Sequence, residues 1–292
     1  LKNKFLWYTT LVSKSSNLRH FENWLTAAQV DEIKVIEGQH RIQALEEIRR
    51  KYPTYECKFP AILWNISDDV DIIIFPEMFT TGFSTNNHEI AELSVGDTLK
   101  WMQEHARNLK TCIIGSIAVN QGNNLYNRLY VVKANEVKFY DKRYLFSMAG
   151  EGKRFTKGKK KLIFDVNGWK IQPLICYDLR FPVYARNVEA YDLLLYVANW
   201  PKPRISAWDT LLKARAIENL CYTIGVNRVG VDANKLEYNG HSAAYDCLGA
   251  QIAETKNNNE DIVIVTLDKN QISEVRNSLN FLNDRDAFEL KK

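Results

Sequence analysis

Three residues of this sequence have side chains suited to nucleophilic catalysis, and each lies at or just beyond the end of a short strand-like stretch. Cys176 ends the apolar run 171–176, Glu77 follows the apolar run 70–75, and Lys142 follows a short strand-like stretch. In α/β folds, functional groups gather where buried strands end. The positions therefore predict that a thiol, a carboxylate and an ammonium meet at one site.

A thiol with an ordinary pKa near about 8.5 is mostly protonated at neutral pH and needs a base. Glu77 is the better candidate, because the five histidines lie in helix-like, polar or atypical segments or before a strand (His20, His40, His88, His105 and His241). Cleavage of an amide creates an oxyanion, which Lys142 and the backbone N–H of Tyr177 could stabilise. We also expect Lys142 to hold Glu77 and Cys176 ionised.

Each of these residues also has an ordinary structural interpretation. A glutamate that follows a proline is often a loop residue, and a lysine in Tyr-Asp-Lys142-Arg is typical of a surface charge. A cysteine on an apolar strand usually packs in the core, as we expect for Cys112, Cys221 and Cys247. Only the combination of the three side chains favours catalysis.

The elements around these residues alternate between strands and helices. Strand patterns cover residues 70–75, 111–119, 123–133, 137–140, 169–176, 193–197, 222–227, 242–246 and 262–267. Helical spacing covers residues 97–108 and 205–220. Strands interleaved with helices predict an α/β fold in which helices cover the sheet faces.

The composition limits the class of protein. A hydrophobic share of 46% and a charged share of 25% over 292 residues are typical of a globular protein with a sizeable core. The net charge of +4 does not favour nucleic-acid binding. No apolar run reaches the roughly 18 residues that a spanning helix needs. Residues 1–10 lack the features of a signal peptide, and we expect no membrane association.

The five cysteines are scattered, and no pair has the spacing of a zinc site or a disulfide framework (Cys57, Cys112, Cys176, Cys221 and Cys247). We therefore expect no metal and a reducing, cytoplasmic location.

The ordered motifs resemble the nitrilase superfamily of carbon–nitrogen hydrolases, most closely its omega-amidase branch. In that superfamily Glu, Lys and Cys follow one another in this chain order, and the separations here are 65 and then 34 residues. The resemblance is dense from Val70 to the C-terminus. It rests on Pro-Glu77-Met-Phe-Thr-Thr-Gly-Phe-Ser, Tyr-Asp-Lys142-Arg-Tyr-Leu-Phe-Ser-Met-Ala-Gly-Glu151, Cys176-Tyr-Asp-Leu-Arg-Phe-Pro-Val, Tyr196-Val-Ala-Asn-Trp-Pro, Gly240-His-Ser-Ala and Phe281-Leu-Asn-Asp-Arg-Asp.

The resemblance implies a four-layer α-β-β-α sandwich that usually dimerises through helices, so we expect a homodimer. It implies that Glu77 is the general base, Cys176 the nucleophile and Lys142 the oxyanion stabiliser, with Glu151 as a further catalytic glutamate. Arg180 matches a position that binds a substrate carboxylate in some relatives, although a structural ion pair is an equal alternative. The pocket candidates are aromatic or sulfur-containing and could equally be core residues: Phe79, Phe83, Met148 and Trp200.

The activity implied by this branch is hydrolysis of a small monoamide, 2-oxoglutaramate or 2-oxosuccinamate, to the 2-oxo dicarboxylic acid and ammonia, without a cofactor. Two alternatives remain. The first is another activity of the superfamily: a nitrilase, a carbamoylase or another aliphatic amidase. The second is a nucleic-acid-associated module.

The second alternative arises from an atypical insertion at about residues 26–65, within a hydrolase domain expected to span residues 1–292. The segment Gly38-Gln39-His40-Arg41 resembles a motif of ParB-like proteins. A first strand is expected over residues 4–12 and a first helix over 17–25. The insertion lies just before the Glu77 strand and could disturb the position of Glu77.

Overall fold

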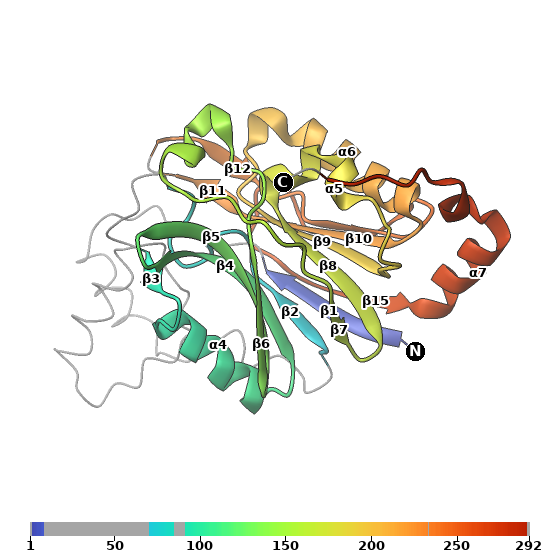
Figure 1. Ribbon diagram of the computed structural model, residues 1–292, viewed down its shortest axis with the longest axis horizontal. Helices are drawn as coiled ribbons and strands as arrows, with labels where there is room; N and C mark the ends of the chain where they lie inside the picture. The colour runs from blue at the N-terminus through green and yellow to red at the C-terminus, as the bar shows by residue number, and fades with distance from the viewer. Residues whose placement is uncertain (1, 9–69, 85–90, 233, 291–292) are drawn as a thin grey trace.

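The computed structural model describes residues 2–8, 70–84, 91–232 and 234–290, with the backbone alone for 2–8 (Figure 1). Two β-sheets face each other, with helix α4 on the outer side of one sheet and α5 and α6 on the outer side of the other. This is the four-layer α-β-β-α sandwich predicted from the sequence. The proposed insertion at residues 26–65, including Gly38–Arg41, lies outside the described residues.

The first sheet has the strand order β15-β1-β2-β4-β5-β6, with β3 added beside β4. Strands β1, β2 and β4 are parallel, whereas β4, β5 and β6 form an antiparallel meander and β15 is antiparallel to β1. The strand bounds are β1 (Lys2–Tyr8), β2 (Ile72–Ile74), β3 (Glu92–Leu93), β4 (Cys112–Gln121), β5 (Asn124–Lys133), β6 (Glu136–Asp141) and β15 (Ile262–Asp268).

The second sheet has the order β14-β13-β10-β9-β8-β7, in which β8, β9 and β10 are parallel. A separate hairpin joins β11 and β12. The bounds are β7 (Phe164–Val166), β8 (Trp169–Ile175), β9 (Leu193–Ala198), β10 (Tyr222–Asn227), β11 (Val229–Val231), β12 (Glu237–Asn239), β13 (Ala243–Tyr245) and β14 (Gln251–Glu254).

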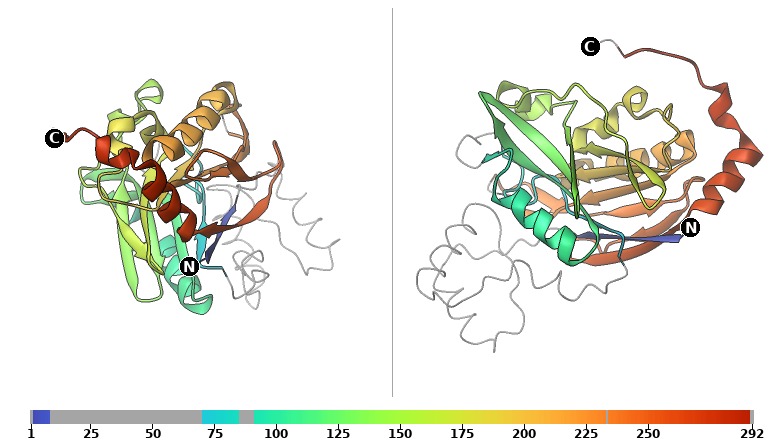
Figure 2. Two further views of the ribbon diagram at one scale, coloured as in Figure 1. Left: turned by 90° about the vertical axis from the view of Figure 1, so that its right-hand side faces the viewer. Right: turned by 60° about the horizontal axis from the view of Figure 1, so that its bottom comes forward.

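The α-helices are α4 (Asp97–Asn108), α5 (Pro182–Ala185), α6 (Ile205–Asn219) and α7 (Lys269–Leu279). Short 3₁₀ turns are η1 (Ser147–Ala149), η2 (Glu151–Lys153), η3 (Cys176–Arg180), η4 (Lys202–Arg204) and η5 (Phe281–Asp284). Figure 2 shows α7 projecting from one edge of the sandwich, with the end of the chain beyond it. Among the described residues, every helix is too short or too polar to cross a membrane.

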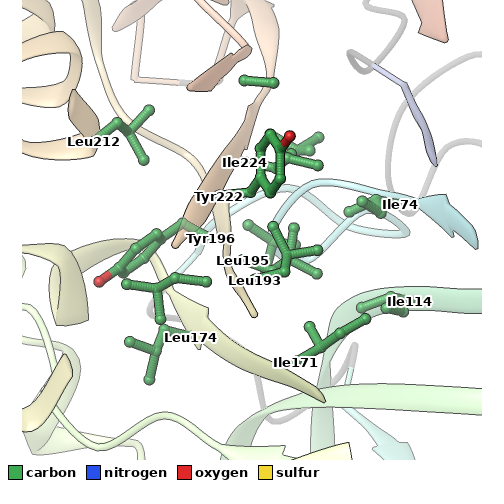
Figure 3. Packing of buried hydrophobic residues seen from close by; sticks show 14 of the residues in the cluster. Ile74, Ile114, Ile171, Leu174, Leu193, Leu195, Tyr196, Leu212, Tyr222 and Ile224 are labelled. Carbon is green, nitrogen blue, oxygen red and sulfur yellow. The ribbon is translucent and has the colours of Figure 1, made fainter. Parts of the chain in front are cut away.

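The main core fills the space between the two sheets. Ile74 and Ile114 from the first sheet and Ile171 and Leu195 from the second belong to one cluster of fully buried side chains (Figure 3). Because both faces of the central parallel strands are covered, these strands read as continuous apolar runs in the sequence. The sandwich therefore holds the strand ends rigidly, and those ends carry the candidate site.

Helix α4 covers the outer face of the first sheet, and α6 covers the second. Buried Leu99 and Met102 of α4 share a cluster with Ile73 and Ile113. Gly225 of β10 lets α6 approach closely, because a Cβ built there would lie 2.4 Å from Leu212. This close packing fixes the second sheet under α6.

The sequence predicted most of these elements within a few residues. Helix α4 has the predicted bounds. The first strand, expected at 4–12, is described over Lys2–Tyr8, where it pairs with β15 residue for residue. Residues 9–12 and the first helix expected at 17–25 lie outside the described residues. Helix α7 and the short strands β3, β7, β11, β12 and β14 were not predicted. The short strands hold two to four residues each, which is too few to show a clear alternation.

Candidate active site

Glu77 lies on a sharp turn just beyond β2. Met78, which follows it, has a positive φ of 44°, and its backbone N–H donates to the Ser116 Oγ at 2.9 Å. The Glu77 carboxylate is almost fully buried and accepts the backbone N–H of Asn199 on Oε2 at 2.8 Å. Asn199 also donates its side-chain amide to the Glu77 carbonyl at 2.7 Å. The end of β9 therefore clamps the turn after β2.

Lys142 lies one residue past the end of β6, and its ammonium group is buried between two carboxylates. The Nζ donates to the Glu77 Oε1 at 2.8 Å and to the Glu151 Oε2 and Oε1 at 3.0 and 3.2 Å. Burial would lower the pKa of Lys142, but the charges of Glu151 and Glu77 outweigh it and raise the pKa above its ordinary value. Lys142 is therefore a permanent cation.

Glu151 begins the turn η2 and is completely buried. Its Oε2 accepts the backbone N–H of Phe146 at 2.6 Å, and its Oε1 accepts the side-chain amide of Asn127 at 3.2 Å. The same amide of Asn127 donates to the Glu77 Oε1 at 2.7 Å. Asn127 and Lys142 thus join the two carboxylates into one hydrogen-bonded cluster.

Cys176 is the first residue after β8 and has a positive φ of 44°, an uncommon conformation for any residue except glycine. Buried Asp178 holds this turn by accepting the backbone N–H groups of Ile175 and Tyr144, each at 2.9 Å, and the hydroxyl of Tyr140 at 2.8 Å. Burial raises the pKa of Asp178 to about 6. The turn is therefore held by the Asp178 carboxylate, which accepts hydrogen bonds from three donors.

The Cys176 thiol belongs to the cluster of Glu77, Lys142 and Glu151. Burial is the largest cause of a pKa raised well above the ordinary value, followed by the Glu77 charge, whereas Lys142 lowers the pKa. A hydrogen bond with Glu77 also raises this pKa. The expectation of an ionised thiol is therefore wrong: burial and two carboxylates outweigh one ammonium, and the resting thiol is protonated.

The predicted binding residues lie in different environments. The Lys142 Nζ lies 5.5 Å from the ring centroid of Phe83. Trp200 is 3% exposed, and the exposed Arg180 places its guanidinium carbon 4.9 Å from the Trp200 ring centroid. Met148 is 72% exposed on η1. Among the described residues, Arg180 makes this aromatic contact and no ion pair, which was the structural alternative.

Phe79 instead belongs to the core on the α4 side. Its ring stacks on Phe75 with centroids 4.8 Å apart, and it lies 6.5 Å from the ring of Trp101. Gly115 makes room for it, because a Cβ built there would lie 2.8 Å from the Phe79 ring. The core interpretation of Phe79 is the one that these contacts support.

Tyr177 lies in the first turn of η3, directly after Cys176. The first N–H groups of a helix have no partner within the helix, so the Tyr177 amide is available to an oxyanion beside the sulfur. Its partly exposed ring meets Phe146 with centroids 5.1 Å apart. Phe146 is thereby tied both to Glu151 and to the turn that carries Cys176.

Comparison with known proteins identifies the family. The sequence profile described as carbon-nitrogen hydrolase matches residues 33–277. The chain belongs to this family. As a carbon–nitrogen hydrolase, it is 41% identical over 221 residues to the omega-amidase YafV of Escherichia coli strain K12, covering 75% of this chain and 86% of YafV. It is 33% identical over 224 residues to the 2-oxoglutaramate amidase of Bacillus subtilis strain 168, covering 75% of this chain and 86% of that protein.

Solved structures of carbon–nitrogen hydrolases share the fold. XC1258 from Xanthomonas campestris, a CN-hydrolase superfamily protein with an arsenic adduct in the active site, matches with a TM-score of 0.81 and 33% identity, covering 100% of both chains. Nit3 of Saccharomyces cerevisiae matches with a TM-score of 0.69 at 19% identity, covering 95% of this chain and 94% of Nit3. The second likeness concerns the fold alone.

Three polar residues of the hydrolase site were not predicted from the sequence: Asn127, Asn199 and Asp178. Asn127 carries a weak signal, because asparagine is depleted in strands and this one interrupts the apolar pattern of β5. Asn199 follows the apolar run of β9 in the same way that Glu77 follows β2. A polar residue inside an apolar strand, or directly after one, is therefore the sequence signal that could have identified Asn127 and Asn199.

The described residues hold no group of three or more histidine, cysteine, aspartate or glutamate side chains placed to bind a metal ion. In the site itself, the carboxylates of Glu77 and Glu151 already accept hydrogen bonds from Lys142, Asn127 and backbone amides. The cluster is organised around an ammonium group.

Replacing Gly158 by alanine is expected to displace the strand end that carries Lys142. The Gly158 N–H donates to the Lys142 carbonyl at 2.9 Å, and a Cβ at Gly158 would lie 1.8 Å from the Asp141 carbonyl oxygen. Because backbone must move, we expect a loss of about 3 kcal/mol or more in the free energy of unfolding, measured by urea denaturation, together with lower activity.

The matched control is Gly152→Ala in the neighbouring turn η2. The nearest atom to a Cβ at Gly152 is 3.9 Å away, on Leu145, so this variant should remain within about 0.5 kcal/mol of the wild type. Equal stability of Gly158→Ala and Gly152→Ala would contradict the assigned close contact.

Proposed function

We propose that this carbon–nitrogen hydrolase is an omega-amidase, which hydrolyses the terminal amide of 2-oxoglutaramate or 2-oxosuccinamate to the 2-oxo dicarboxylic acid and ammonia. The observation that carries the proposal is the 41% identity to the omega-amidase YafV over 86% of that protein's length. The 2-oxoglutaramate amidase of Bacillus subtilis supports the same substrate class. The buried cluster of Glu77, Lys142, Glu151 and Cys176 supplies the groups that amide hydrolysis requires.

In the first half of the proposed reaction, Cys176 attacks the amide carbon while its proton passes to the Glu77 carboxylate. General-base assistance is needed because the resting thiol is protonated. The new carbon–sulfur bond places negative charge on the former carbonyl oxygen, which the Lys142 ammonium and the Tyr177 N–H stabilise. Glu77 then gives the proton to the departing nitrogen, the carbon–nitrogen bond breaks, and ammonia leaves a thioester on Cys176.

In the second half, water attacks the thioester. Glu77 accepts a proton from this water, the same oxyanion donors act again, and the carbon–sulfur bond breaks as the proton returns to the Cys176 sulfur. Glu151 is a positioning residue in this scheme, because both of its oxygens hold the Lys142 ammonium. The reaction consumes one water and needs no cofactor.

The substrate-binding residues that we propose are Arg180, Phe83 and Trp200. Arg180 carries the charge that a substrate carboxylate needs, and the buried Trp200 ring holds its guanidinium group. Phe83 lies beside the Lys142 ammonium and could border the reacting amide. Met148 is an exposed candidate for the rim, and Phe79 is left out because of its core contacts.

A panel of small substrates tests this function. Ammonia release by the purified chain should give a kcat/KM for 2-oxoglutaramate at least about 100-fold above the values for an aliphatic nitrile and an N-carbamoyl amino acid, because neither competitor combines a terminal amide with a 2-oxo acid. A nitrile or a carbamoyl substrate turned over faster than 2-oxoglutaramate would support the alternative activities and reject the omega-amidase.

We propose that the enzyme is a homodimer formed through α5 and α6. Exposed apolar side chains occur on α5, just after it and on α6, at Val183, Val188 and Ile217, with exposed fractions of 51%, 43% and 45%. An apolar surface of this kind is typical of a subunit interface. Sedimentation should therefore give twice the monomer mass.

We further propose a single hydrolase domain with an insertion at about 26–65.

We propose a cytoplasmic location for the enzyme. The four cysteines within the described residues are free thiols, which a reducing compartment maintains (Cys112, Cys176, Cys221 and Cys247).

A further inference from the structure

Two arginines contact the same buried indole beside the site. The guanidinium carbon of Arg180 lies 4.9 Å from the ring centroid of Trp200, and the indole N–H of Trp200 donates to the backbone carbonyl of Arg204 at 2.8 Å. The backbone of Trp200 is itself fixed, because its N–H donates to the Asn227 Oδ1 at 2.7 Å. The backbone of Arg204, at the end of the short turn η4, is therefore fixed against the same Trp200 ring that the Arg180 side chain covers.

The side chain of Arg204 contacts a second aromatic ring, that of Phe146. Its guanidinium carbon lies 5.3 Å from the ring centroid of Phe146. Phe146 contacts the ring of Tyr177, the residue after Cys176, and donates its backbone N–H to Glu151. Arg204 thus lies over the ring of a residue, Phe146, that contacts both Tyr177 and Glu151.

The charge of Arg204 is not neutralised by any acidic side chain of the described residues. Arg128 and Arg215, in contrast, form ion pairs with Asp141 and Glu218 at 2.6 and 2.9 Å. Arg204 is also only partly exposed, so it is not simply a solvated surface charge.

The acidic groups near the site are already engaged. Glu77 and Glu151 accept hydrogen bonds from Lys142, and Asp178 accepts three hydrogen bonds from its own turn and from Tyr140 and Tyr144. A guanidinium group held against an aromatic ring, without a carboxylate of its own, is well suited to a carboxylate from a ligand, because its planar N–H donors match two oxygens.

We propose that Arg204 is a specificity-determining residue that acts with Arg180 to bind the carboxylate end of the substrate. The aromatic contacts of both guanidinium groups restrict their rotation before the substrate arrives, which lowers the entropic cost of binding. The pair therefore selects amides that carry a carboxylate over neutral amides. This inference rests on the proposed omega-amidase function and adds a residue to its substrate site.

The test compares a charged and a neutral amide of the same chain length. For Arg204→Gln, kcat/KM for 2-oxoglutaramate should fall by about 10- to 100-fold, mainly through KM, because the lost contact is made equally in the ground state and the transition state. The kcat/KM for pentanamide should stay within about 3-fold. Arg204→Lys should recover part of the loss, since a lysine restores the charge but not the paired donors.

Lys202→Gln is the matched control. Lys202 lies on the same turn η4, carries the same charge, and is exposed in an ion pair with Glu237. Its removal should change both substrates by less than about 3-fold. If Arg204→Gln lowers kcat/KM for both amides equally, Arg204 has only a structural role and the inference fails. Unchanged kinetics on 2-oxoglutaramate would overturn it as well.

A binding measurement separates this inference from the proposed function. Titration calorimetry of Cys176→Ala with the dicarboxylate 2-oxoglutarate gives a Kd that does not depend on turnover. In Cys176→Ala/Arg204→Gln this Kd should be about 10- to 100-fold weaker. An equal Kd in the two variants rejects the role of Arg204. A wild-type enzyme that does not hydrolyse 2-oxoglutaramate rejects the omega-amidase, whatever the two Kd values show.

Discussion

Replacing Cys176 by alanine is expected to reduce kcat for ammonia release from 2-oxoglutaramate by at least about 10⁴-fold. The thiol is the only group of the cluster that can form the proposed covalent intermediate, and its removal leaves Glu77 and Lys142 without a nucleophile. Alanine preserves the backbone of the turn, because the N–H groups that hold it donate to the Asp178 carboxylate and not to the sulfur. The melting temperature should therefore stay close to that of the wild type.

Cys247→Ala provides the control, because Cys247 is a free and buried cysteine outside the catalytic cluster. This variant should keep its activity within about 3-fold. Steady-state ammonia release and thermal unfolding should be measured on both variants from the same preparation. Activity of Cys176→Ala above a small percentage of the wild type, in a folded protein, would reject Cys176 as the nucleophile.

The sequence predicted that the side chains of Glu77, Lys142 and Cys176 meet at one site, because each of them lies at or near the end of a strand. Glu77 is the third residue after β2, and Lys142 and Cys176 are the first residues after β6 and β8. The two facing sheets bring these strand ends together. Strand ends are visible in the sequence because an apolar run stops abruptly at a polar residue. The positions of the side chains therefore follow from the pattern once the sheets are correctly ordered.

The polar partners of these side chains could not be predicted in the same way. Asn127 lies within a strand and Asn199 just after one, and their contacts with Glu77 join strands that are 50 and 122 residues from it in the sequence. Such pairings depend on how the two sheets are aligned, which no local pattern records. Phe79 illustrates the same limit, because its spacing does not show whether its ring faces the pocket or α4.

The protonation state of Cys176 also required the three-dimensional structure. One ammonium group beside the thiol suggested an ionised Cys176, but the structure places the sulfur in a partly buried position beside the carboxylates of both Glu77 and Glu151. Both changes raise the pKa of Cys176. In the proposed reaction the chemistry therefore begins with proton transfer from Cys176 to Glu77 and not with a resting thiolate.

Replacing Lys142 by methionine is expected to abolish activity and to destabilise the fold at the same time. The ammonium group is the shared donor of Glu77 and Glu151, and both carboxylates are buried. Its loss removes the oxyanion stabiliser, which should lower kcat by at least about 10³-fold. It also leaves two buried negative charges without a cation, at a cost of about 3–5 kcal/mol in the free energy of unfolding at pH 8.

The pH dependence identifies the cause of this destabilisation. Without Lys142, the folded variant should bind an extra proton between the two carboxylates, whereas the unfolded chain does not at neutral pH. Because the folded state then holds more protons than the unfolded state, the stability of the variant falls as the pH rises. Urea denaturation at pH 5 and pH 8 should show a larger deficit relative to the wild type at pH 8.

Two further variants test whether the charge of Lys142, and not its packing, causes the destabilisation. In Lys142→Met/Glu151→Gln one of the two charges is removed, so stability at pH 8 should partly return while activity does not. Lys161→Met breaks a more exposed ion pair, with Glu189 at 3.0 Å, and should cost less than about 1 kcal/mol at either pH. A deficit in Lys142→Met that is the same at both pH values, and that Glu151→Gln does not reduce, would show that the packing of the lysine side chain matters and its charge does not.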